Sequence, residues 1–126
     1  MILLLHTLIE AVVGLLFLFY PAGVPFVPGF ADGAGESFLL LQKMYGLAAL
    51  FLAGLSLYAY LRQRNDTVFF LVTASLSAFH YAMIGVQTFY NPDSRAALLH
   101  FLLAIFLTGQ FLGRRKVRWQ DRAHLN

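Results

Sequence analysis

Long apolar runs separated by short polar stretches dominate the chain. Helices that cross a bilayer core need about 20 apolar residues, and four stretches reach roughly that length: residues 2–20, 37–61, 67–90 and 95–113. They lack the alternation of β-strands and are too long for the strands of a closed barrel. The pattern predicts an all-α fold, a polytopic membrane protein built as an antiparallel four-helix transmembrane bundle in a single domain, residues 1–126.

The first apolar run needs to be distinguished from a cleaved signal peptide. No basic residue precedes it, and Glu10 interrupts it. Signal peptides have a basic start followed by an unbroken apolar stretch. We therefore expect residues 2–20 to be retained as a transmembrane helix.

Composition supports a membrane protein. Hydrophobic residues make up 60% of the chain and charged residues 12%, against about 25% charged residues in average soluble domains. A soluble protein of this size could not bury so much apolar surface. The absence of cysteine excludes disulfides, thiolate metal sites and thiol redox chemistry. The net charge of +3 comes from the C-terminal tail, next to the last apolar run. Basic residues in this position indicate the orientation of the protein in the membrane, and we expect no nucleic-acid partner.

The connections between the runs differ in length and charge. Residues 21–36 are rich in proline, glycine and large apolar side chains, and we expect them to fold over one end of the bundle as a cap. Basic residues concentrate in the second connection and in residues 114–126, at Arg62, Arg64, Arg114, Arg115, Lys116, Arg118 and Arg122. By the positive-inside rule, that side and both termini are cytoplasmic. The expected location is the inner membrane of a bacterium, with the cap facing outward.

Each predicted helix has one face of small or polar residues at helical spacing. The four faces consist of His6, Glu10 and Gly14; of Gln42, Gly46, Ala49, Ala53 and Ser56; of Thr73, Ser77, His80 and Gln87; and of Ala97, His100, Ala104 and Thr108. A polar face in hydrocarbon is costly, whereas small and polar residues suit contacts between transmembrane helices. We expect these faces to point into the bundle.

The ionisable residues among them are candidates for a functional site. With a rise of about 1.5 Å per residue, Glu10 and His80 fall near mid-membrane and His6 falls in the inner half. The candidate ligand-binding residues, from the middle outward, are Glu10, Gln42, Lys43, Tyr45, His80, Gln87 and His100. We expect Glu10 to pair with Lys43 or with His80, although Lys43 could instead extend to the interface. The alternative is structural: a buried pair that fixes helix register, with Gln42 and Lys43 as interfacial anchors.

The spacing of the polar residues does not favour a metal site or a nucleophilic active site. The sequence contains no H-E-x-x-H motif, nucleophile elbow or phosphate-binding loop. His80 and His100 differ by roughly 8 Å in depth on the helical rise, which disfavours a bis-histidine haem, and one glutamate is too few for a di-metal carboxylate site. We therefore expect no metal centre, and the sequence identifies no cofactor.

The layout resembles the DoxX-like superfamily of small four-helix membrane proteins. The similarity lies in HTLIEAVVGLLFLFYP with its early acidic residue, in QKMYGLAALFLAGL after the Pro/Gly-rich connection, in FHYAMIG, and in a short last helix with a basic tail. The resemblance implies a four-helix bundle associated with membrane oxidoreductases or quinones. Some relatives carry cysteines that this chain lacks, so a thiol-based role does not transfer.

Two functions remain in competition, and whether the protein is an enzyme stays open. The first is binding of a lipophilic small molecule, quinone- or isoprenoid-like, in a polar pocket linked to membrane redox chemistry. The second is a non-catalytic accessory, structural or assembly subunit. A proton path along His6, Glu10 and His80 is less favoured because four short helices leave little room for a gated pore. The expected partners are the lipid bilayer, a lipophilic ligand, and a larger membrane complex or a homo-oligomer.

Overall fold

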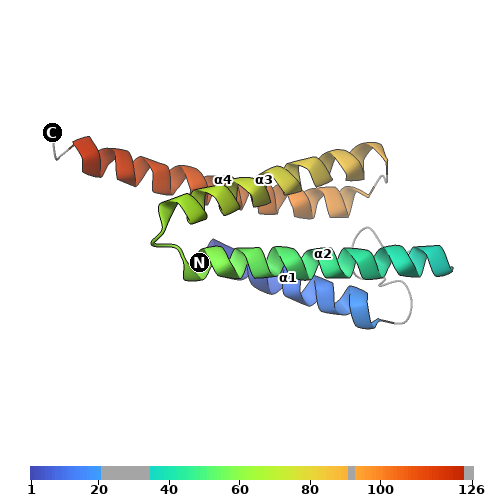
Figure 1. The fold of residues 1–126 in the computed structure, drawn as a ribbon. Helices are drawn as coiled ribbons and strands as arrows, with labels where there is room; N and C mark the ends of the chain where they lie inside the picture. Colours follow the sequence, from blue (N-terminus) through green and yellow to red (C-terminus); the bar gives the residue numbers. More distant parts are fainter. Residues whose placement is uncertain (21–34, 91–92, 124–126) are drawn as a thin grey trace.

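Four helices form the described part of the protein. The computed structural model describes residues 1–20, 35–90 and 93–123, with side chains as far as Lys116. The helices are α1 (Ile2–Phe19), α2 (Glu36–Leu61), α3 (Asp66–Phe89) and α4 (Ser94–Ala123). They pack as an antiparallel bundle (Figure 1), which confirms the predicted fold class.

All four helices are long and apolar enough to cross a membrane, in α4 over Ser94–Lys116. The chain is thus a four-span integral membrane protein. The predicted starts, and the predicted ends of the first three spans, agree with the helices to within one residue. The fourth differs, because α4 does not end at residue 113 but continues to Ala123. The basic stretch that follows contains no proline and is rich in residues with good helix propensity. The expected cap over residues 21–34 lies outside the described residues.

The bundle consists of two helical hairpins. α1 packs along α2, and α3 packs along α4, while the contacts of α2 with α3 and of α1 with α4 are fewer. In Figure 1 the two hairpins lie one above the other, and Met1, the α2–α3 connection and the C-terminal part of α4 lie at the same end. The space between the hairpins is therefore the place where polar faces from all four helices can meet.

The distribution of side chains is opposite to that of a soluble protein. Large apolar side chains such as Leu8, Phe51 and Leu71 are exposed on the outside of the bundle. Buried residues include many small and polar ones, and His80, Gln42 and Thr73 are fully buried. This arrangement places the apolar surface against lipid and the polar side chains between helices, as the sequence predicts for the first three helices. On α4 the buried residues are Ala96, Leu103, Ala104 and Leu107, so the predicted face is displaced, and its members Ala97, His100 and Thr108 are only half-buried.

Glycine allows the closest approach between α1 and α2. A Cβ atom added at Gly14 would lie 2.8 Å from Cγ of Leu50 and 2.9 Å from the carbonyl oxygen of Gly46. A Cβ added at Gly46 would in turn lie 3.0 Å from the carbonyl oxygen of Gly14. The two backbones thus touch where side chains would hold them apart.

An arginine fastens α4 to the connection between α2 and α3. The guanidinium of Arg114 donates to the carbonyl of Gln63 and, at 3.0 Å, to Oδ1 of Asp66. It also lies 4.3 Å from the centre of the Phe69 ring, in cation–π geometry. The start of α3 is capped by Asn65, whose side chain accepts from the Val68 amide. The end of the bundle that carries the basic residues is therefore tied together by polar contacts.

We expect Gly14→Ala to lower the unfolding free energy in detergent by about 1–3 kcal/mol, the usual cost of overpacking a tight contact. The matched control is Gly54→Ala in α2, because nothing lies within 4 Å of the added Cβ there. Gly54→Ala should leave stability unchanged or raise it, since alanine favours helix more than glycine does. Equal effects of the two substitutions would contradict the close contact between α1 and α2.

Candidate functional site

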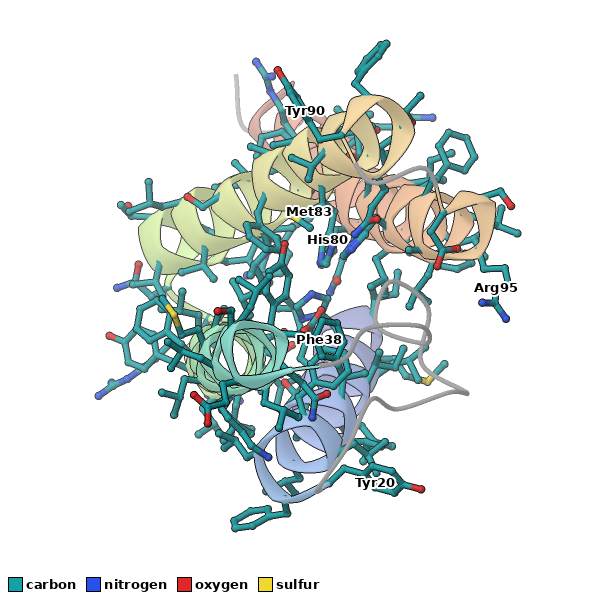
Figure 2. All side chains as sticks on the ribbon, turned by 90° about the vertical axis from the view of Figure 1, so that its right-hand side faces the viewer. Tyr20, Phe38, His80, Met83, Tyr90 and Arg95 are labelled. Carbon is teal, nitrogen blue, oxygen red and sulfur yellow. The ribbon has the colours of Figure 1, made fainter. Side chains whose placement is uncertain are left out.

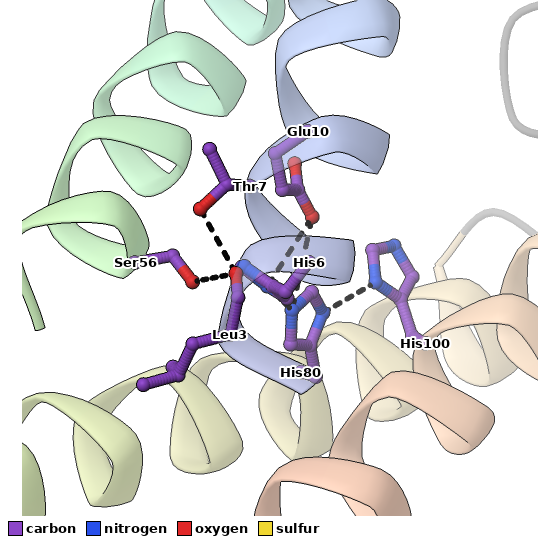
Figure 3. Close-up of polar contacts among 7 residues, drawn as sticks. All are labelled: Leu3, His6, Thr7, Glu10, Ser56, His80 and His100. Carbon is purple, nitrogen blue, oxygen red and sulfur yellow. Dashed lines mark hydrogen bonds and ion pairs between the residues drawn. The ribbon is translucent and has the colours of Figure 1, made fainter. Parts of the chain in front are cut away.

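Three histidines and a glutamate form a continuous polar cluster across both hairpins (Figure 3). Nε2 of His6 on α1 lies 2.8 Å from Nε2 of His80 on α3, and Nδ1 of His80 lies 3.0 Å from Nδ1 of His100 on α4. Glu10, one turn after His6, places Oε1 3.7 Å from Nε2 of both His6 and His80. The cluster therefore links three helices through side chains alone.

Two hydroxyl groups hold the backbone beside this cluster. Ser56 of α2 donates to the carbonyl of Leu3 at 2.8 Å, and Thr7 donates to the same carbonyl at 2.9 Å. The start of α1 is thereby attached to α2 one turn before His6. This attachment fixes the level at which the imidazole of His6 enters the space between the hairpins.

The hydrogen bonds constrain the histidine tautomers. A neutral imidazole carries one N–H and one lone pair, so His80 must donate with one nitrogen and accept with the other. Within the described residues, Nδ1 of His6 is buried without a partner, and a buried orphan N–H is rarer than an orphan acceptor. The favoured arrangement has Nε2–H of His6 donating to His80, and Nδ1–H of His80 donating to His100.

Glu10 has imidazoles and no cationic side chain as its close partners in the described part of the chain. It is only 7% exposed, and His6 and His80 are essentially fully buried. A carboxylate in such surroundings needs a proton or a positive partner, because an isolated buried charge is very costly. The predicted pairing of Glu10 with His80 is confirmed.

The alternative pairing of Glu10 with Lys43 is wrong. Nζ of Lys43 donates instead to the carbonyls of Leu18 and Tyr20, at 2.6 and 2.9 Å. Helix α1 ends at Phe19, so its last carbonyls have no donor within the helix. Lys43 on α2 lies beside that end and supplies the missing hydrogen bonds.

Gln42 has a similar position. Its Nε2 donates to the carbonyl of Phe17 at 3.1 Å and to that of Tyr20 at 3.4 Å. Gln42 and Lys43 together cap the C-terminus of α1. Neither residue lines the cavity described next. These two of the predicted ligand-binding residues therefore stabilise the end of a helix.

A cavity of about 280 Å³ lies between the hairpins and is lined by residues from all four helices. Its wall is mostly apolar, with side chains such as Phe17, Met44 and Phe79. Four predicted site residues supply polar groups to it: Glu10, Tyr45, Gln87 and His100. In Figure 2, His80 and Met83 point into the space between the hairpins, whereas Tyr20, Tyr90 and Arg95 lie at the periphery.

His80 is not part of the cavity wall but lies behind it. It contacts two wall residues, Glu10 at 3.7 Å and His100 at 3.0 Å. Tyr45 spans the cavity between α2 and α3, with its hydroxyl 3.9 Å from Sδ of Met83. Five of the seven predicted residues therefore belong to one region, either as wall or as direct support of the wall.

The histidine contacts do not follow the depths expected from the helical rise. His80 and His100 are in hydrogen-bond contact rather than separated, and His6, assigned to the inner half, contacts His80. The helical rise places each residue as a point on an upright helix, whereas imidazole side chains extend several ångströms from the backbone and helices can tilt. His6 was missed as a site residue, although its four-residue spacing to Glu10 was a usable signal.

The remaining polar residues of α3 have a local role. Oγ of Ser77 donates to the carbonyl of Thr73 at 2.9 Å, within the same helix. Both lie on the buried face of α3. They do not extend the cluster.

Three of the cluster atoms could hold one metal ion. Nε2 of His6, Oε1 of Glu10 and Nε2 of His80 all lie within 4.8 Å of one another. The expectation of no metal centre depended partly on a separation in depth between His80 and His100. In the structure the imidazoles of these two residues are in contact.

Comparison of the chain with protein-family models, with curated proteins and with solved structures finds no match. The function must therefore be argued from the geometry of the cavity and of the cluster behind it.

Proposed function

We propose that the protein binds a lipophilic small molecule with a polar head group, quinone- or isoprenoid-like, in the cavity between the hairpins. The observation that carries this proposal is a mostly apolar cavity with polar side chains from every helix, inside a four-span bundle. Binding sites for small molecules are typically apolar with a few placed polar groups. The volume of about 280 Å³ is near the lower end for such sites and suits a single ring or a segment of chain.

The polar groups of the wall have separable roles in this proposal. Glu10 and His100 would exchange hydrogen bonds or protons with a carbonyl or hydroxyl of the head group. Tyr45 and Gln87, from opposite hairpins, would orient it. The histidines behind the wall can pass a proton by exchanging tautomers. Any electron transfer would take place on the ligand. This role agrees with the proposed DoxX-like type and its link to membrane redox chemistry.

Filling the cavity tests the proposal. Ala96 is buried and lines the cavity, so Ala96→Phe should reduce a co-purified lipophilic molecule by at least about tenfold, equivalent to about 1.4 kcal/mol. Mass spectrometry of lipids extracted from protein purified in mild detergent gives the amount per chain. The control is Ala82→Phe, on the exposed face of α3, which should leave the amount unchanged. Glu10→Gln, which keeps the size of the side chain, should also lower it.

Two results would count against ligand binding. One is that no lipid is enriched in the wild-type protein over the bulk membrane. The other is that Ala96→Phe and Ala82→Phe carry the same amount of the enriched lipid.

An accessory role in a larger membrane complex is the second candidate. The extension of α4 favours it, because this helix continues beyond the bundle and carries Arg115 and Lys116, both exposed. Such a basic helix can contact a partner protein or anionic lipid. Mass measurement after native purification separates the two candidates, since a protein recovered alone or as a homo-oligomer contradicts the accessory role.

The proposed orientation follows from charge. Arg62 and Arg64 lie at the same end as the basic part of α4, and this end is proposed to face the cytoplasm of a bacterium, with both termini there. The cavity lies toward the other end, because its wall includes Phe17 and Gln87 near the ends of α1 and α3, and Ala96 near the start of α4. It would then occupy the outer half of the membrane.

Single-cysteine labelling tests this orientation without background, because the chain has no cysteine. Tyr90→Cys, at the end of α3, should react with a membrane-impermeant maleimide in intact cells. Gln63→Cys, in the α2–α3 connection, should react only after the cells are opened. The reverse pattern would place the cavity in the cytoplasmic half.

A further inference from the structure

Three side-chain atoms of the buried cluster surround a single point at the distance of a metal–ligand bond. The triangle has sides of 2.8 Å between the two Nε2 atoms and 3.7 Å from each Nε2 to Oε1 of Glu10. The point equidistant from these three atoms lies about 2.0 Å from each. This distance agrees with the bonds of zinc to histidine nitrogen and carboxylate oxygen, which are about 2.0–2.2 Å long. We propose that His6, Glu10 and His80 bind one divalent transition-metal ion.

The charge of the cluster supports this proposal. Glu10 is buried next to two imidazoles, with no lysine or arginine in ion-pair contact among the described residues. A divalent ion supplies the positive charge that the carboxylate otherwise lacks. Two imidazole nitrogens and one carboxylate oxygen match zinc and ferrous iron, and the absence of cysteine removes the soft ligands that select Cu(I).

The surroundings of His80 fit those of a metal ligand. Histidine ligands usually bond their second nitrogen to another group, which fixes the ring and its tautomer. Nδ1 of His80 is 3.0 Å from Nδ1 of His100, so with Nδ1–H donated to His100 the Nε2 lone pair is free for the ion. His100 is thus a positioning residue, not a ligand.

The surroundings of His6 fit less closely. Binding through Nε2 moves its proton to Nδ1, which is buried without a partner among the described residues. That cost weakens the site relative to a closed structural zinc site. Three protein ligands leave a further coordination position for water or another small group, as in catalytic zinc sites, and a tetrahedral ion would require the two Nε2 atoms, 2.8 Å apart, to separate by about 0.5 Å.

The metal site goes beyond the proposed lipid binding and does not require it. His6 and His80 are not in the cavity wall, and Glu10 is the residue that the two sites share. Failure of lipid enrichment would leave the metal site standing, and failure of metal binding would leave the cavity standing.

The test is a Co²⁺ titration of the purified protein without a histidine tag, after treatment with a chelator. The background carries His124→Gln, which removes the one histidine outside the cluster. We expect one Co²⁺ per chain with visible d–d absorption, displaced by one Zn²⁺, and one Zn²⁺ per chain by elemental analysis. Glu10→Gln and His80→Gln should each abolish the absorption.

Two control variants distinguish ligands from neighbours. Ser77→Ala removes a buried polar residue of α3 that lies outside both the triad and the cavity wall and bonds to the Thr73 carbonyl, so it should leave the titration unchanged. His100→Gln should keep one ion per chain but weaken affinity by about 10–100-fold, the usual effect of losing a group that supports a ligand. Circular dichroism and gel filtration establish that each variant is folded.

The proposal is overturned if the wild-type protein retains no stoichiometric Co²⁺ or Zn²⁺. It is equally overturned if folded Glu10→Gln and His80→Gln variants titrate like wild type. Should those variants not fold, X-ray absorption of the zinc-loaded wild-type protein decides. Two imidazoles and oxygen at about 2.0–2.1 Å support the site, and a shell without imidazole refutes it.

Discussion

The burial of the Glu10 carboxyl group between two imidazoles is the constraint on which the site depends. The group lies inside a four-span bundle and is almost fully buried. In such an environment a lone carboxylate costs far more than the few kcal/mol that separate folded from unfolded proteins. Lys43, the cationic partner that the sequence predicted for Glu10, donates instead to carbonyls at the end of α1. The charge of Glu10 must therefore be compensated within the cluster by a proton or by a bound cation.

The same cluster explains how the two hairpins stay in register. Direct packing is dense within each hairpin and sparser between them. His6 and Glu10 come from the first hairpin, His80 and His100 from the second, and their contacts cross the interface. In hydrocarbon the burial of apolar side chains does not drive helices together, so polar bonds and close packing determine the association. A cluster that positions the hairpins also shapes the cavity between them.

The sequence predicts the helices well because the bilayer sets their length and the hydropathy pattern reports it directly. It also identifies the inward faces of α1, α2 and α3, since helical spacing alone brings His6 next to Glu10 and His80 onto the face of Thr73. It does not predict which polar side chains meet across helices. These contacts depend on the tilt and rotation of the helices and on the length of the side chains, and the rise per residue gives none of the three. Lys43 illustrates a second limit, because its amino group binds two carbonyls at the end of α1, and the sequence does not show how close Lys43 on α2 lies to that end.

Glu10 belongs to both the cavity wall and the three-atom cluster, and this shared position couples the two proposed sites. The cluster uses Oε1 of Glu10 for both histidines, which leaves Oε2 available for a group in the cavity. An ion bound at Oε1 would fix the carboxylate in its ionised form, as an acceptor only. A head group that donates a hydrogen bond would then bind more tightly with the ion in place, and a head group that only accepts would bind less tightly. By linkage, each ligand would change the affinity for the ion by the same factor. The sign of that coupling would show whether the cavity holds a hydroxyl-bearing or a carbonyl-bearing molecule, such as a quinol or a quinone.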